Sequence, residues 1–81
     1  MSGKAFIRRR VHVRWTPLGW KIDVDGRRLR PTFSTKRMCR RAARAIAEAV
    51  QPSELFVHGR SGRIGERATY PRSSDPSSSV G

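Results

Sequence analysis

The stretch VHVRWTPLGWKIDV, residues 11–24, decides the fold. Apolar and polar residues alternate on both sides of a turn at Thr16–Gly19, and the apolar positions are Val11, Val13, Trp15, Trp20, Ile22 and Val24. A period of two is typical of strands that bury one face. The stretch therefore predicts two antiparallel strands joined by a tight turn, with both tryptophans in the core.

A third strand is predicted over residues 27–33. The pair Asp25-Gly26 before it favours a hairpin turn. Pro31 cannot donate a hydrogen bond to a β-ladder, so this strand is expected to be short, irregular or at an edge.

Two closing strands are predicted at residues 54–58 and 63–70, on either side of the turn Gly59–Gly62. Ile64 and Tyr70 fall in phase in the last of them. Phe56 falls out of phase with the apolar residues beside it, which places it on the second face of the sheet. If that face is bare, it is a surface for a partner or for a homodimer.

A helix is predicted between the third and fourth strands. Ser34 or Thr35 can cap its start, and Gln51-Pro52-Ser53 stops it. One half of the helical wheel is apolar and comprises Met38, Cys39, Ala42, Ala45, Ile46, Ala49 and Val50. The other half is charged and comprises Lys36, Arg37, Arg40, Arg41, Arg44 and Glu48. The order β-β-β-α-β-β thus predicts an α+β fold, a small, mainly antiparallel sheet with one amphipathic helix on one face.

Length and composition indicate a single domain. We expect a basic flexible arm at residues 1–10, the α+β domain at 11–71 and a disordered serine-rich tail at 72–81. Cys39 is the only cysteine, which excludes an internal disulfide and a cysteine-based zinc site. No apolar run is long enough to span a membrane, and none follows the basic start as in a signal peptide. The expected location is therefore the cytoplasm, with no membrane contact.

Three short segments carry a resemblance to a known family. They are VHV at 11–13 with the following Gly19-Trp20, FSTK at 33–36 before an alanine-rich helix, and the closing hairpin ELFVHGRSGRIGE at 54–66. On these segments, residues 11–70 resemble the bacterial domain-of-unknown-function 2188 family. The resemblance implies a fold and no established activity. The helix departs from the family pattern, in which charge is mixed or acidic, because it has five basic residues and no acid before Glu48.

Positive charge is concentrated in the first half of the chain. Of the 18 Lys and Arg residues, 14 lie in residues 1–47 with only two acids, and the net charge of the whole chain is +12. Such a directed field most often attracts nucleic acid. On the predicted helix, like charges crowd neighbouring turns and the positive N-terminal end, which opposes helix stability. This cost in helix stability indicates that the charged face binds an anion. The alternative interpretation is a solvated helix face in an arginine-rich protein.

We therefore expect a non-catalytic nucleic-acid-binding protein that contacts phosphates, with DNA favoured over RNA. The chain has one glutamine, Gln51, and no asparagine, so no base-reading amide stands among the arginines. Weak sequence preference is therefore expected. Whether the basic segments share one surface depends on the fold, and the arm alone is equally well interpreted as a solubilising terminus. The expected contact residues are Lys36, Arg37, Arg40, Arg41 and Arg44 of the helix, Arg8, Arg9 and Arg10 of the arm, and Arg27, Arg28 and Arg30.

Two other functions are compatible with the sequence. One is a protein–protein interaction module, of a phage or mobile-element type, that docks on an acidic host protein. The other is a ribosome- or RNA-associated factor in which Phe56 contacts unpaired bases. Neither of the two histidines, His12 and His58, neighbours an acid in a recognisable arrangement, so no enzyme activity, metal or cofactor is expected. The Gly59–Gly62 turn is interpreted as an ordinary hairpin rather than a phosphate-binding loop.

Overall fold

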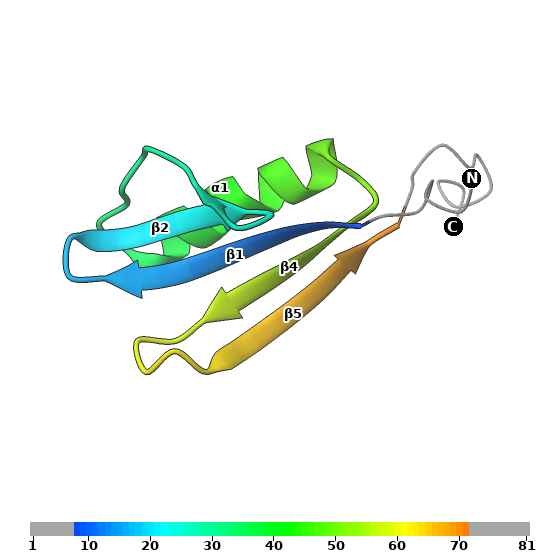
Figure 1. The fold of residues 1–81 in the computed structure, drawn as a ribbon. Coiled ribbons are helices and arrows are strands. Elements are labelled where there is room, and N and C mark those ends of the chain that lie inside the picture. The colour runs from blue at the N-terminus through cyan, green and yellow to red at the C-terminus, as the bar shows by residue number, and fades with distance from the viewer. Residues whose placement is uncertain (1–7, 72–81) are drawn as a thin grey trace.

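The alternating residues at the start of the chain form the predicted hairpin, and the rest of the sheet is built around it (Figure 1). The computed structural model describes residues 8–71. Its elements are β1 (Arg9–Thr16), β2 (Gly19–Val24), β3 (Arg27–Arg28), α1 (Lys36–Ala49), β4 (Ser53–His58) and β5 (Ile64–Tyr70). Within these residues, no helix has the length and apolarity that crossing a bilayer requires.

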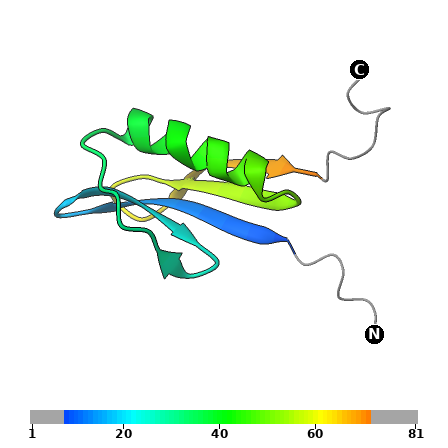
Figure 2. The same cartoon turned by 90° about the horizontal axis from the view of Figure 1, so that it is seen from above.

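The sheet has the strand order β3-β2-β1-β4-β5. β1 and β4 run parallel at its centre, and the other neighbouring strands are antiparallel. A parallel pair needs a crossover connection, and α1 provides it by lying across one face of the sheet (Figure 2). The predicted α+β fold, with one helix on one face of a mainly antiparallel sheet, is confirmed.

The core lies between α1 and the face of the sheet that it covers. The sheet contributes bulky apolar side chains, and the helix contributes only small ones. The buried sheet residues are Val11, Val13, Trp20, Ile22, Leu55 and Val57, and the buried helix residues are Cys39, Ala43 and Ala47. Small helix residues let the backbone of α1 approach the sheet, where large sheet residues fill the space.

The rotation of α1 differs from the prediction. Ala43 and Ala47 were not placed in the apolar half, yet they are fully buried, whereas Met38 is 55% exposed and Ala45 and Ala49 are exposed. The wheel predicts where apolar residues cluster, but a broad apolar sector does not say which part of it faces the sheet. The buried stripe repeats every four residues from Cys39, which leaves the arginines on one flank and Met38 on the other.

The strand ends also differ from the prediction. β1 begins at Arg9, so Arg9 and Arg10 belong to the sheet and not to a flexible arm. β3 has two residues, and beyond it only a bridge between Trp20 and Phe33 continues the pairing. Residues 1–7 of the predicted arm and 72–81 of the predicted tail lie outside the described residues.

Two apolar side chains differ from their predictions, Trp15 in its burial and Ile64 in its strand phase. Trp20 is buried as predicted, but Trp15, paired with it near the hairpin turn, is 36% exposed and has Arg60 4.6 Å from its ring centroid. A register shift between Val57 and His58 breaks the predicted phase of the last strand. Ile64 consequently stands opposite His58 and is exposed, whereas Tyr70 pairs with Ser53.

The start of α1 is fixed by a close approach between two chain segments. Trp20 N–H donates to the Phe33 carbonyl at 2.8 Å, and Phe33 N–H donates to the Trp20 carbonyl at 2.9 Å. Gly19 permits this approach, because its φ is +132° and a Cβ there would lie 2.9 Å from the Phe33 oxygen. Two residues later, Thr35 caps the helix with Oγ1, which accepts from the Met38 N–H at 3.2 Å.

Cys39 is expected to be inert in the folded protein. Burial raises the pKa of its thiol to about 11, and a rise of two units lowers the thiolate fraction about 100-fold. A chromogenic disulfide reagent at pH 8 should therefore label the native protein at least about 100-fold more slowly than the urea-unfolded chain. Equal rates in the two states would show that Cys39 is not buried between α1 and the sheet.

Candidate functional site

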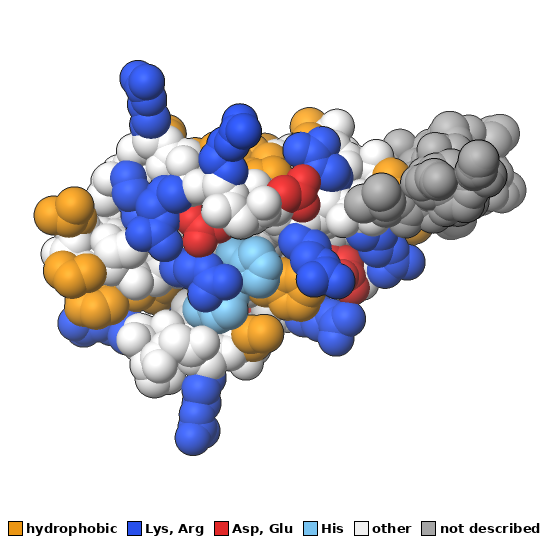
Figure 3. All heavy atoms as spheres, in the orientation of Figure 1, with side chains coloured by type: hydrophobic (Ala, Val, Ile, Leu, Met, Phe, Trp, Pro, Cys, Tyr) orange, Lys and Arg blue, Asp and Glu red, His pale blue; other side chains and the backbone are white. Residues whose placement is uncertain are grey.

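Most of the basic side chains in residues 8–71 lie on two opposite faces of the molecule. We call one group the helix flank, and it comprises Lys36, Arg37, Arg40, Arg41 and Arg44. The other group lies on the sheet face, the side of the sheet opposite α1, and comprises Arg8, Arg10, Arg14, Lys21, Arg28 and Arg67. Figure 3 shows the sheet face, with basic side chains surrounding a pale blue centre formed by the histidines.

The helix flank is a group of cations only partly neutralised by acids. Arg40 binds Glu66 of β5 through two contacts of 2.8 Å, and Arg44 lies 3.6 Å from Glu48. The Arg40 guanidinium lowers the pKa of Glu66. Among residues 8–71, no carboxylate oxygen lies within 4 Å of the three remaining cations, Lys36, Arg37 and Arg41.

The four arginines of the helix flank surround one hollow. Arg37, Arg40, Arg41 and Arg44 line an open depression of about 340 Å³ on the solvent side of α1. No acid lies in the first turn of the helix, where the backbone carries a positive partial charge. The structure thus gathers the predicted helix residues around a space that favours an anion.

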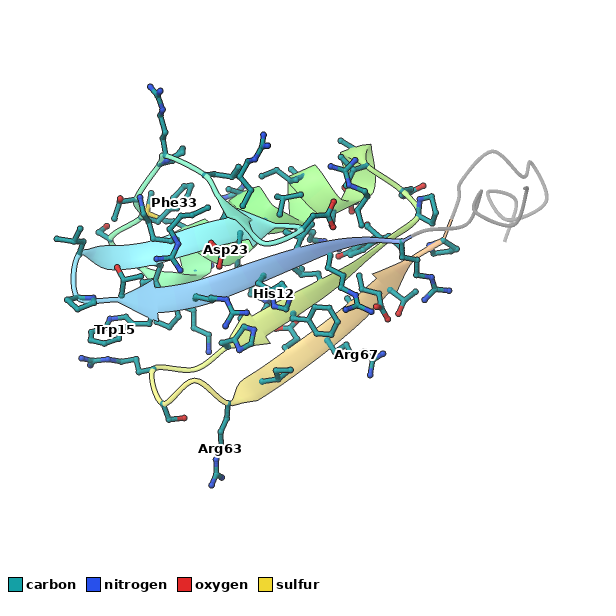
Figure 4. The ribbon with its side chains drawn as sticks, in the orientation of Figure 1. His12, Trp15, Asp23, Phe33, Arg63 and Arg67 are labelled. Atoms are coloured by element: carbon teal, nitrogen blue, oxygen red, sulfur yellow. The ribbon has the colours of Figure 1, made fainter. Side chains whose placement is uncertain are left out.

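On the sheet face, one row of side chains crosses all five strands. Each residue stands directly opposite the next, in the order Arg28, Asp23, His12, Phe56 and Arg67 (Figure 4). The His12 and Phe56 rings stack with centroids 4.7 Å apart, and the Arg67 guanidinium lies 5.5 Å from the Phe56 centroid. Because β4 lies between β1 and β5, the Phe56 ring is enclosed between His12 and Arg67.

The contact between the two histidines was not predicted from the sequence. His12 Nδ1 lies 2.9 Å from His58 Nε2, and His58 Nδ1 lies 3.1 Å from the Gly62 carbonyl oxygen. A carbonyl only accepts, so His58 Nδ1 carries a proton and donates to Gly62, and one further proton is shared between His12 Nδ1 and His58 Nε2. Strand alternation directed both histidines away from the apolar residues of their strands, which was the one signal in the sequence. Only the parallel pairing of β1 with β4 shows that the two side chains lie next to each other.

Two buried carboxylates hold the arginines of the sheet face. Asp23 is bound by Arg28 at 2.9 Å and by Arg14 at 3.0 Å. Glu54 is bound by Arg67 at 3.0 Å and by Arg8 at 3.6 Å. The hydrogen bond from Arg28 lowers the pKa of Asp23, and that from Arg67 lowers the pKa of Glu54. Five arginines and Lys21 against two acids leave this face with a net charge of +4.

The predicted contact residues therefore do not share one surface. Arg8, Arg10 and Arg28 join the sheet face, on the other side of the molecule from the helix flank. Arg9 pairs with Asp25, and Arg27 lies beside a hollow lined by Leu29 and Ile46. Arg30 is exposed in the loop between β3 and α1.

Comparison with known proteins assigns the chain to a family. Residues 11–70 match the model of a family described as an uncharacterized protein conserved in bacteria (DUF2188). The chain belongs to this family. The DUF2188 match runs from β1 to the end of β5, so it includes the helix flank and both histidines, and it confirms the resemblance seen in the sequence. No curated protein and no solved structure matches the chain.

This DUF2188 domain is expected to lose stability in two steps as the pH falls. Burial, followed by the charges of Arg14 and His58, lowers the pKa of His12. The unfolded chain then binds this proton more readily than the native protein does, so the free energy of unfolding falls below about pH 6.5 and levels off at the lower native pKa. The pKa values of Asp23, Asp25, Glu54 and Glu66 are also lowered, which predicts a second decline below about pH 4.5.

Urea unfolding of the DUF2188 domain from pH 8 to pH 3 would measure both steps. The variant His12→Gln should lack the first decline and keep the second. Identical profiles for the variant and the wild type between pH 7 and pH 5 would contradict the assignment of the first step to His12.

Proposed function

We propose that the protein binds nucleic acid without catalysis, and that the helix flank holds the phosphate backbone of duplex DNA. One observation carries the proposal: four arginines line a single hollow, next to the start of a helix that has no acid in its first turn. Guanidinium groups bind phosphate through paired N–H donors, and the helix N-terminus adds a positive partial charge. An arriving phosphate would relieve the repulsion among these cations.

The aromatic side chains favour a duplex over unpaired bases. Binding of unpaired bases requires accessible ring faces. The ring of Phe56 lies between His12 and Arg67, Trp15 has Arg60 beside its ring, and Trp20 is buried. Contacts to a phosphate backbone need no ring face, so they fit this surface better. In a bacterial cell, such contacts would locate the protein on the nucleoid.

A second hollow favours the alternative of a protein partner. It measures about 370 Å³ and is lined by Phe33, Met38, Ala42 and Ala45, with Arg41 at its side. An apolar centre beside an arginine is suited to an acidic protein surface. Competition separates the two functions, because heparin or bulk DNA displaces a nucleic acid but leaves a complex with a buried apolar centre largely intact.

Titration of the purified protein with labelled duplex DNA, single-stranded DNA and structured RNA tests the proposal. We expect the duplex to bind tightest. If about five phosphates are neutralised, the logarithm of the affinity should fall with the logarithm of salt concentration at a slope of about −4.5. Failure of the folded protein to bind any of the three at low salt would overturn the proposal and assign the arginines to an acidic protein.

A further inference from the structure

We propose that the sheet face is a second duplex-binding surface, so that one molecule bridges two DNA segments. This inference rests on the proposed function, in which the helix flank binds the first duplex. The helix flank has five basic side chains and two acids, a net charge of +3, and the sheet face has six basic side chains and two acids, a net charge of +4. A protein that bound DNA through one surface alone would need positive charge on only one side of the molecule.

The two surfaces point away from each other. α1 covers one side of the sheet, and the row from Arg28 to Arg67 lies on the other side (Figures 2 and 4). A helix layer on a sheet layer separates the two surfaces by about 20 Å. The Debye length at physiological salt is about 8 Å, so the two duplexes would be largely screened from each other. Simultaneous binding is therefore sterically and electrostatically permitted.

Four of the five arginines of the sheet face are bound to carboxylates before any ligand arrives. Asp23 fixes Arg14 and Arg28 on one side of the row, and Glu54 fixes Arg8 and Arg67 on the other. Each guanidinium has five N–H donors, and these contacts use only one or two of them. The remaining donors are available to phosphate oxygens, and little side-chain entropy is left to lose on binding.

The spacing of these arginines fits two phosphate strands. Arg28 and Arg67 are four strand positions apart, which corresponds to about 19 Å between their backbones. Between them lies an aromatic centre of His12, Phe56 and His58. The major groove of B-DNA is about 12 Å wide, so arginines at both ends of the row can lean inward to the two backbones that border it.

Two matched triple variants separate the surfaces. In the sheet-face variant, Arg10→Gln, Arg28→Gln and Arg67→Gln remove three positive charges while Asp23 keeps Arg14 and Glu54 keeps Arg8. In the helix-flank variant, Lys36→Gln, Arg37→Gln and Arg41→Gln do the same while Glu66 keeps Arg40 and Glu48 keeps Arg44. No buried carboxylate loses its last partner in either variant, so both are expected to fold, which circular dichroism would verify.

The assay is capture of a second, fluorescent duplex by protein bound to a duplex immobilised on beads. The wild type should capture the second duplex. The sheet-face variant should bind the first duplex within a few-fold of wild type yet lose capture, because three lost contacts weaken that surface about 500-fold at about 0.1 M salt. Light scattering would report the oligomeric state in the same buffer.

The outcomes distinguish this inference from the proposed function. If the wild type binds one duplex but captures no second one, the bridging proposal fails and the proposed function stands. Capture by the sheet-face variant at the wild-type level would assign bridging to a dimer or to the helix flank, and the sheet face would be excluded. Absence of binding to the first duplex would overturn both.

Discussion

In the sheet-face variant, where the helix flank is the remaining duplex-binding surface, replacing Arg37 and Arg41 with glutamate is expected to weaken duplex binding by at least about 60-fold at about 0.1 M salt. Each lost phosphate contact removes about 0.9 log unit of affinity. The two new negative charges add repulsion to this loss. The slope of log affinity against log salt should fall from about −4.5 to about −2.7. Fluorescence anisotropy over a range of salt concentrations measures both quantities.

The same double variant should remain folded and become slightly more stable. Arg37 is the second residue of α1, where a negative charge interacts favourably with the helix dipole by about 0.3–1 kcal/mol. The substitution at Arg41 also places an acid three residues before Arg44, a favourable spacing. Binding and stability would thus change in opposite directions, which separates loss of contact from loss of fold.

The matched control is the double variant Arg60→Glu with Arg63→Glu, in the turn between β4 and β5. It changes the net charge by the same amount, but at residues outside the helix flank. Its affinity for duplex DNA should therefore fall much less. An equal loss in both variants would mean that total charge governs binding, and unchanged affinity in the helix variant would exclude the helix flank as the site.

The variant Gly19→Ala is expected to lower the free energy of unfolding by about 3 kcal/mol, from backbone strain at positive φ together with a steric clash. The added Cβ would lie 2.7 Å from Thr32 Cγ2 and 2.9 Å from the Phe33 oxygen. The Thr32 methyl can turn aside, but the carbonyl of Phe33 is held by Trp20. Relief of the clash would pull the segment before α1 away from β2.

Two other glycines are controls for this variant. Gly26 has a φ of +84° but open space around its Cβ position, so Gly26→Ala should show the backbone strain alone, about 1–2 kcal/mol. Gly59→Ala should change little, because its nearest neighbour is an ordinary contact at 3.9 Å. Urea unfolding would rank the three, and a Gly19→Ala variant no less stable than Gly26→Ala would contradict the role of the close approach.

The local parts of the fold could be predicted from the sequence. Alternation at Val11–Val24 predicted the first hairpin, and Thr35 and Pro52 marked the limits of the helix, because these signals act between residues close in the chain. The pairing of β1 with β4 could not be predicted in the same way. A period of two indicates which side of a strand is buried, but it does not indicate which distant strand lies beside it.

Of the candidate site, too, only the local part could be predicted from the sequence. The helix arginines lie on one element, so their grouping followed from helical spacing alone. The sheet face combines residues from all five strands, and its composition depends on strand order and register. His12 and His58 are 46 residues apart in the chain, and no local pattern connects them.

The central parallel pair has a further consequence for how this domain can be joined to others. Arg9, Ser53 and Tyr70 stand in one row, so the strands by which the domain begins and ends are two strand positions apart, about 10 Å. Both junctions lie at the same end of the sheet (Figure 1). Such a domain can be inserted into a surface loop of a host protein without separating the two ends of that loop. A short peptide that joins the two ends of the domain would also allow circular permutation, with the new termini in the Gly59–Gly62 turn.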